Sequence, residues 1–252
     1  IGSSAFSGCT GLTKVNAASI EAWGKINFIS KEANPTYYAK KLYVDGKEVT
    51  AVTIPEGITK VSGYAFINCE DITAVTVPAS AESIEAYAFS GCSSLVNVTL
   101  PEGITTVGGY AFTDCTSLKK ITVPKSVTEI GDSAFKGCTS LEEMTLPFVG
   151  LSRTATSKMG VFGAVFGYTT AGSSSTKVDG AIYQYCNSVS VTYYHYYIPS
   201  SLRKVTITDA AKIPKNAFYN CNMLTEININ EGITAIDVSA FYNCTGITEI
   251  TI

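Results

Sequence analysis

The chain has 252 residues, of which 46% are hydrophobic and only 15% are charged, and its formal net charge is −3. This composition is too apolar for a disordered chain, and the charge provides no basic field for nucleic acid or an anionic membrane surface. The longest apolar runs are short and interrupted by Thr, Gly and Pro, so we expect no insertion into a membrane.

The chain begins inside a sequence motif, Ala-Phe-x-x-Cys, that recurs at several places along it. It opens with "IGSSAFSGC", in which Phe6 and Cys9 have the same spacing as later pairs, and it stops at "ITEITI". Both ends therefore resemble cuts inside repeating units, and we expect the sequence to be an excerpt. The lack of a signal peptide at the first residue then says nothing about the compartment.

A first irregular stretch spans about residues 16–48 and lacks the recurring motif. Asp45-Gly46, between strand-like residues, predicts a hairpin with a type I′ turn near residues 40–50. Trp23 and Phe28 are the large apolar residues of this stretch, and we expect them to pack where the motif's phenylalanine is missing. The stretch is interpreted as a structural variant of the repeat.

The recurring motif is Ala-Phe-x-x-Cys, and its period is 23 residues. Phe66, Phe89, Phe112 and Phe135 follow one another at this interval, as do Phe218 and Phe241. Each phenylalanine follows an alanine and precedes a cysteine by three positions. Because such a period is the signature of a repeat architecture, the repeats decide the fold.

A strand pattern, L-x-x-V-T-I-P, runs in step with the motif. In "LKKITVP", Ile121 and Val123 point to one face, whereas Lys120 and Thr122 point to the other. The proline ends the strand because it cannot donate to a ladder. One such unit cannot bury its apolar face alone, so stacked units predict a solenoid.

A second irregular stretch spans about residues 148–201. Its first half is rich in Gly and Ser and predicts a mobile loop near residues 171–176. "GVFGAVFG" within it lacks the Lys and Ser/Thr of a phosphate-binding loop. Its second half is dense in tyrosine and holds the only histidine; the members are Tyr183, Tyr185, Tyr193, Tyr194, His195, Tyr196 and Tyr197.

This tyrosine-dense stretch is the first candidate for contact with a partner or glycan. Insertions in solenoids often leave on the binding face. Tyrosine offers rigid, amphipathic contact area at low entropic cost. The alternative is that the tyrosines pack on the insertion itself, and the sequence leaves both readings open.

The polar side of the strands is the second candidate surface, represented by Lys120, Thr122, Glu143 and Thr145. Threonine suits an exposed strand and its hydroxyls can pair along a stack, which is a purely structural explanation. The alternative is a flat polar face that binds an extended partner or glycan. The outward column that holds Lys120 and Glu143 shifts from neutral to charged along the solenoid without a strong single-sign patch, so we expect no steering by charge.

The cysteines predict structure rather than chemistry. No C-x-x-C spacing suggests a metal site. Parallel neighbours in the stack would hold their Cβ atoms at about 4.8 Å, longer than the ~3.5–4.5 Å of a disulfide. We therefore expect a column of buried free thiols that resist thiol reagents; Cys186 lies outside this register.

Nothing in the sequence predicts an enzyme, a metal or a cofactor. Nucleophilic catalysis would need a base beside Cys or Ser. The single histidine leaves only a Cys186–His195 pair, which we do not expect. Adjacent Glu142 and Glu143 point to opposite faces of a strand, so they do not form a carboxylate pair.

The motif and strand together resemble the BspA-like leucine-rich repeats, over residues 1–15, 49–147 and 202–252. The resemblance implies a right-handed, curved solenoid with a parallel sheet on the concave face and short strands or turns on the convex face. We expect one solenoid domain over residues 1–252.

Proteins of this type are typically found on bacterial surfaces and in some parasitic protists. The resemblance therefore implies an extracellular or cell-surface binding or adhesion module for a macromolecule or glycan. A passive spacer within a larger surface protein is the alternative, and the sequence does not predict the oligomeric state.

Overall fold

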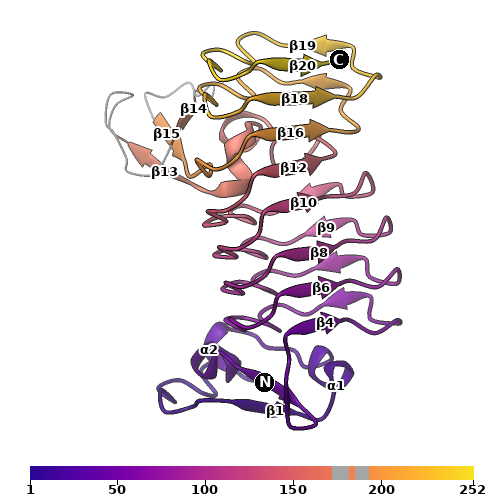
Figure 1. Cartoon of the computed structure of the whole chain (residues 1–252), viewed down its shortest axis with the longest axis vertical. Helices are drawn as coiled ribbons and strands as arrows, with labels where there is room; N and C mark the ends of the chain where they lie inside the picture. Colours follow the sequence, from indigo (N-terminus) through magenta and orange to yellow (C-terminus); the bar gives the residue numbers. More distant parts are fainter. Residues whose placement is uncertain (172–181, 185–192) are drawn as a thin grey trace.

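The computed structural model describes residues 1–171, 182–184 and 193–252. The chain winds as a solenoid whose turns stack from one terminus to the other (Figure 1). Each predicted strand pattern forms a strand on the face turned to the viewer in Figure 1. These front strands are β1 (Val15–Ala17), β4 (Ala51–Thr53), β6 (Ala74–Thr76), β8 (Asn97–Thr99), β10 (Lys120–Thr122), β12 (Glu143–Leu146), β16 (Lys204–Ile207), β18 (Glu226–Ile229) and β20 (Glu249–Thr251).

From β4 onward the front strands form two parallel sheets, β4-β6-β8 and β10-β12-β16-β18-β20, in the register that the repeat predicts. Lys120 lies opposite Glu143 and Thr122 opposite Thr145. Across the second irregular stretch, Met144 still lies opposite Val205, so β12 and β16 are direct neighbours. The extra residues therefore leave the solenoid from one side without breaking the front sheet.

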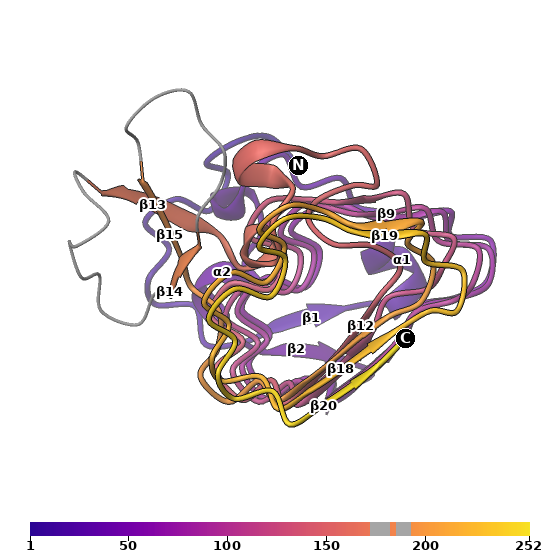
Figure 2. The ribbon, with the colours of Figure 1, turned by 90° about the horizontal axis from the view of Figure 1, so that it is seen from above.

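Shorter back strands lie across the solenoid from the front strands, as the view along the stack in Figure 2 shows. They form two separate parallel sheets, β5-β7-β9-β11 and β17-β19. With these two layers the predicted leucine-rich repeat solenoid is confirmed. The back strands are β5 (Lys60–Val61), β7 (Ser83–Ile84), β9 (Thr106–Val107), β11 (Glu129–Ile130), β17 (Lys212–Ile213) and β19 (Ala235–Ile236).

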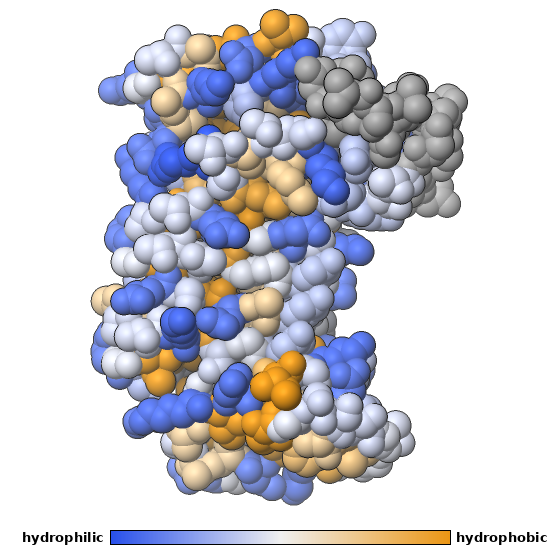
Figure 3. Space-filling model, turned by 180° about the vertical axis from the view of Figure 1, so that it is seen from behind, coloured by the Kyte–Doolittle hydropathy of each residue, from blue (hydrophilic) through white to orange (hydrophobic). Residues whose placement is uncertain are grey.

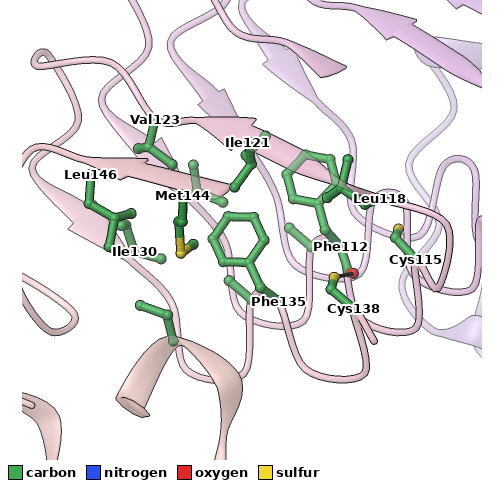
Figure 4. Close-up of a cluster of buried hydrophobic side chains, with 14 of the residues drawn as sticks. Phe112, Cys115, Leu118, Ile121, Val123, Ile130, Phe135, Cys138, Met144 and Leu146 are labelled. Carbon is green, nitrogen blue, oxygen red and sulfur yellow. Dashed lines mark hydrogen bonds between the residues drawn. The ribbon is translucent and has the colours of Figure 1, made fainter. Parts of the chain in front are cut away.

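The phenylalanines of the motif form the centre of the core between these layers. Phe66, Phe89, Phe112 and Phe135 are fully buried, and consecutive rings stack with centroids 5.3, 5.5 and 5.7 Å apart. Figure 4 shows Phe112 and Phe135 surrounded by the inward residues of β10 and β12. The period of 23 residues thus places identical side chains above one another.

The cysteines form a second column beside the phenylalanines, and all seven described cysteines are free. The predicted buried thiols are confirmed for Cys69, Cys92, Cys115, Cys138 and Cys221, whereas Cys244 is only partly buried and Cys9 is exposed. Cys186 lies outside the described residues.

Each thiol in the middle of the column also makes a directed contact. Sγ of Cys92, Cys115 and Cys138 donates to the carbonyl of the phenylalanine one turn earlier, at 3.2, 3.3 and 3.2 Å; the last of these bonds is drawn in Figure 4. Burial raises the pKa of Cys138 to about 12, so its thiol stays protonated at neutral pH. The column therefore joins consecutive turns rather than supplying a nucleophile.

Labelling with N-ethylmaleimide, followed by peptide mapping, tests this column. In the native protein we expect rapid modification of Cys9 and none of Cys92, Cys115 or Cys138, because only the first is exposed. In denaturant all four should react alike. Native labelling of Cys115 at the rate of Cys9 would contradict the buried column.

Two residues of each motif adopt the left-handed backbone conformation. The residue before each cysteine does so, as at Gly91 (φ 77°) and Asp114 (φ 58°), and so does the residue before each alanine, as at Tyr87 (φ 61°). Glycine, Asn and Asp tolerate this region best, which explains their preference before the cysteine. The bulkier Tyr64, Tyr87 and Tyr110 stack face to face, with centroids 5.0 and 4.7 Å apart, which offsets the strain.

The first irregular stretch forms the hairpin that its sequence predicts. Asp45 (φ 50°) and Gly46 (φ 73°) turn between β2 and β3, and Tyr43 lies opposite Glu48. In addition, β2 pairs in parallel with β1, which the sequence did not predict. The elements are α1 (Ile20–Gly24), η1 (Lys31–Ala33), α2 (Thr36–Ala39), β2 (Leu42–Val44) and β3 (Lys47–Glu48).

Trp23 and Phe28 fill the core of this variant turn, as predicted. Both are buried, and their rings lie 5.2 Å apart. Nε1 of Trp23 donates to the Ala65 carbonyl at 2.7 Å, and Nδ2 of the buried Asn34 donates to the same oxygen at 3.1 Å. Elsewhere this carbonyl accepts from a motif phenylalanine, as Ala88 O does from Phe66 N. Side chains thus replace the missing backbone donor.

The second irregular stretch builds two 3₁₀ segments and a small antiparallel sheet beside the motif turns (Figure 2). One 3₁₀ segment, η3, replaces a motif in the stack: Phe135 N donates to Val165 O, and Phe162 N donates to Ala217 O. "GVFGAVFG" therefore fills the phenylalanine column. The loop predicted near residues 171–176 lies almost wholly outside the described residues. The elements are η2 (Ser157–Met159), η3 (Phe162–Phe166), β13 (Tyr168–Ala171), β14 (Ile182–Gln184) and β15 (Tyr193–Tyr196).

Among the described residues, no helix is long and apolar enough to cross a bilayer.

Candidate functional site

Gln184 anchors the small sheet of the insertion to the solenoid. Its amide is fully buried, accepts from Gly163 N at 2.7 Å and donates to the carbonyls of Ala217 and Tyr219, each at 3.3 Å. Gly163 is required here because a Cβ on it would lie 2.4 Å from Cβ of Tyr196. The insertion is therefore a fixed part of the solenoid wall.

Tyr194 and Tyr196 contact Lys158 of η2, which belongs to the insertion itself. Nζ of Lys158 lies 4.8 Å from the ring centre of Tyr168 and 5.5 Å from that of Tyr194. The hydroxyl of Tyr196 donates to the Lys158 carbonyl at 2.8 Å. A hydrogen bond with Tyr168 raises the pKa of Lys158, so the ammonium stays charged within its aromatic surroundings. These tyrosines hold the insertion together.

The structure corrects the candidate contact set at two residues, Tyr196 and His195. Tyr196 is 0% exposed and His195 only 3%, so neither can lie directly against a macromolecule. Burial lowers the pKa of His195, which favours the neutral imidazole. Its ring lies 5.5 Å from Tyr183, which in turn lies edge-on to Tyr219 at 6.1 Å. The candidate Tyr185 and the side chain of the candidate Tyr193 lie outside the described part of the chain.

Tyr197 lines a cavity between the insertion and the motif turns, which we call the insertion cavity. Its volume is about 530 Å³. Buried Cys138, Ile198 and Pro199 contribute apolar walls. Its polar groups come from Asp114, Lys136, Thr139, Ser200 and Asn222. A cavity of this size, with mixed apolar walls and a few polar groups, is typical of a small-ligand site.

The polar groups of the insertion cavity are positioned by the repeat itself. Asp114 and Gly137 occupy the left-handed position before a cysteine in consecutive turns. Oδ1 of Asp114 lies over Gly137, where a Cβ would approach it to 2.1 Å. Nζ of Lys136 lies 5.2 Å from the ring centre of Tyr197. An aromatic ring, a carboxylate, an ammonium and an amide therefore surround one hollow.

The candidate residues of the front face pair with each other. Nζ of Lys120 lies 2.8 Å from Oε2 of Glu143, and the same arrangement recurs at Lys204 and Glu226, at 2.5 Å. Thr122 and Thr145 lie side by side in the same ladder. Solvent-exposed pairs of this kind contribute little stability. The front face therefore presents charges of both signs, paired across neighbouring strands, at these residues.

Sequence reasoning missed Asp114, Lys136, Asn222 and Met223. They occupy variable positions of the motif or follow its cysteine, and nothing in one repeat distinguishes them from their counterparts. The available signal was indirect, because the break in the period places the insertion beside the turns of the flanking repeats.

The described residues contain no cluster of three or more His, Cys, Asp or Glu side chains that could hold a metal. Burial raises the pKa of Cys69 and of Cys138 to about 12, opposite to what a nucleophilic thiol needs.

Comparison with known proteins bears on the repeats. A family model described as the BspA type leucine-rich repeat region matches six copies, over residues 36–157 and 189–252. No curated protein matches the chain.

Several solved structures are similar to the chain at low identity. A leucine-rich repeat protein from Bacteroides ovatus is 22% identical with a TM-score of 0.48, and the match covers 98% of this chain and 68% of that one. A leucine-rich repeat protein of T. pallidum is 22% identical with a TM-score of 0.43, and the match covers 81% of this chain and 69% of that one. A leucine rich cell surface protein from Faecalibacterium prausnitzii is 22% identical with a TM-score of 0.30, and the match covers 95% of this chain and 64% of that one. With TM-scores below 0.5, these likenesses add nothing to what the family model shows.

Proposed function

The chain belongs to the BspA-type leucine-rich repeat family, and from this premise we propose that it is a non-enzymatic module that binds a glycan at a cell surface or outside the cell. The extracellular location rests on the resemblance to a family typical of bacterial surfaces. The choice of a glycan as the ligand rests on the chemistry of the insertion cavity.

The insertion cavity is the observation that carries the proposal. Sugars present apolar C–H faces that pack on aromatic rings, and hydroxyls that bond to carboxylates and amides. Tyr197 supplies the ring, while Asp114 and Asn222 supply acceptors and a donor within the same hollow. About 530 Å³ accommodates one or two sugar rings, so we expect recognition of a terminal unit of a longer glycan.

A glycan array, with hits quantified by calorimetry on the full chain, tests this function. Tyr197→Ala should weaken binding of the best hit at least about tenfold, because the stacking ring is removed. Asn222→Ala should weaken it less. Tyr242→Ala provides the matched control: this tyrosine is 56% exposed and is not part of the cavity lining.

Three outcomes would contradict the proposal. Binding that tolerates Tyr197→Ala would place the ligand elsewhere, with the front face as the next candidate. Hits restricted to a parallel array of proteins would replace the glycan by a protein partner. Failure to bind either array would favour the passive spacer.

A further inference from the structure

The back sheet is interrupted where the front sheet is continuous. β11 is the last strand of the first back sheet, and beyond it Ile130 N donates to Leu151 O at 2.8 Å, while Glu129 bridges Ser152 in antiparallel fashion. The next back strand, β17, pairs only with β19 in the described chain. One turn of the solenoid therefore lacks a regular back strand.

A cavity opens at this interruption, and we call it the back cavity. Its volume is about 820 Å³. Its inner wall includes Phe148, Val149 and Val161, each under 5% exposed, and Ala210 at 7%. Figure 3 views the solenoid from this side and shows apolar surface between hydrophilic side chains. An apolar molecule could thus be enclosed without rearrangement of the core.

Arg153 bridges the two turns on either side of the back cavity. Its guanidinium lies 5.4 Å from the ring centre of Phe148 and donates to Lys125 O at 3.2 Å. It also donates to the backbone carbonyl of Asp209 and, at 2.6 Å, to Oδ2 of the same residue. Arg153 therefore links the turn of Lys125 to that of Asp209 beside the cavity, and Asp209 neutralises its charge.

Among the described residues, the other charged side chains that line the back cavity include one lysine without an ion-pair partner. Lys212 faces Asp237 at 3.6 Å. Lys215 also lines the cavity, is exposed, and has no ion-pair partner among the described residues. An apolar hollow with one unpaired ammonium at its edge complements a molecule with an apolar body and one acidic group.

A peptide strand is a poorer occupant, although β17 has a free edge. In the turns of β7, β9, β11 and β19, the residue after the back strand donates to the preceding turn, as Gly131 N does to Val107 O at 2.7 Å. In the β17 turn this position is Pro214, which has no N–H to donate. Proline on an exposed edge is a common protection against added strands.

We propose that the back cavity binds a small amphipathic anion, with its apolar body against Phe148, Val149 and Val161 and its acidic group at Lys215. This site is separate from the insertion cavity and does not depend on the proposed glycan function.

The fluorescent aryl sulfonate 8-anilinonaphthalene-1-sulfonate is a suitable probe for the full chain. We expect the probe to bind saturably and octanoate to displace it. 1-Octanol has the same apolar body without the charge, so it should displace the probe at least about tenfold less effectively than octanoate. Lys215→Met keeps the side-chain length and should remove most of the preference for octanoate over octanol.

Two further variants locate the binding. Ala211→Phe, at an exposed position of the cavity wall, should abolish displaceable binding by filling the space. Lys125→Met removes a neighbouring lysine outside the lining and should change nothing. Equal displacement by octanol and octanoate, or binding unaffected by Lys215→Met and Ala211→Phe, would overturn the proposal.

Discussion

Replacing Phe112 by alanine should lower the free energy of unfolding by about 3–5 kcal/mol, as expected for truncating a fully buried aromatic side chain. Phe112 is 0% exposed and stacks between Phe89 at 5.5 Å and Phe135 at 5.7 Å. The backbone on both sides is fixed by the ladder, so we expect the cavity to collapse little. Denaturant unfolding of the full chain, followed by circular dichroism, measures the loss.

A graded series makes this prediction specific. Phe112→Leu retains most of the volume and should cost about 1 kcal/mol. Tyr242→Ala removes an aromatic ring that is 56% exposed. Its stacking on Tyr219 is lost, but apart from that contribution the free energy of unfolding should fall by no more than about 0.5 kcal/mol. If Phe112→Ala costs less than about 1 kcal/mol, the phenylalanine column is not the core that the structure describes.

The regular part of the fold was predictable because each repeat carries the same pattern. Ile121, Val123 and their counterparts in the other regular units point inward, and the constant spacing by itself fixes the register between Lys120 and Glu143. The Asp45-Gly46 hairpin was equally predictable, since its turn is specified by two adjacent residues. Local sequence patterns, repeated along the chain, were therefore sufficient to predict this part of the fold.

The candidate sites were less predictable because each is formed where segments of different sequence come together in the folded chain. The insertion cavity joins Tyr197 to Asp114 and Asn222, which belong to three separate parts of the chain. The tyrosine density of the insertion suggested exposed contact area, yet Tyr196 is buried because Gly163 and Lys158 lie against it. Composition alone does not say which face of a strand a tyrosine occupies.

Gln184→Met should destabilise the chain by about 2–3 kcal/mol and release the insertion from the solenoid. Methionine matches the length of glutamine but leaves the Gly163 N–H, fully buried, without its acceptor, and buried unpaired groups cost about 1–3 kcal/mol each. The Tyr219 carbonyl loses the donor that now lies at 3.3 Å. Denaturant unfolding gives the energetic loss.

Hydrogen exchange then separates local release from general destabilisation. In Gln184→Met, amides of η3 and β15 should exchange much faster, while those of β6 and β8, many turns away, should keep their protection, because turns of a solenoid interact mainly with their neighbours. Thr170→Val, an exposed position on β13, should leave both regions unchanged. Uniform loss of protection would instead mean that Gln184 supports the whole stack. Retained protection of η3 would show that the aromatic contacts around Lys158 suffice to hold the insertion, and that the buried amide serves only to satisfy Gly163.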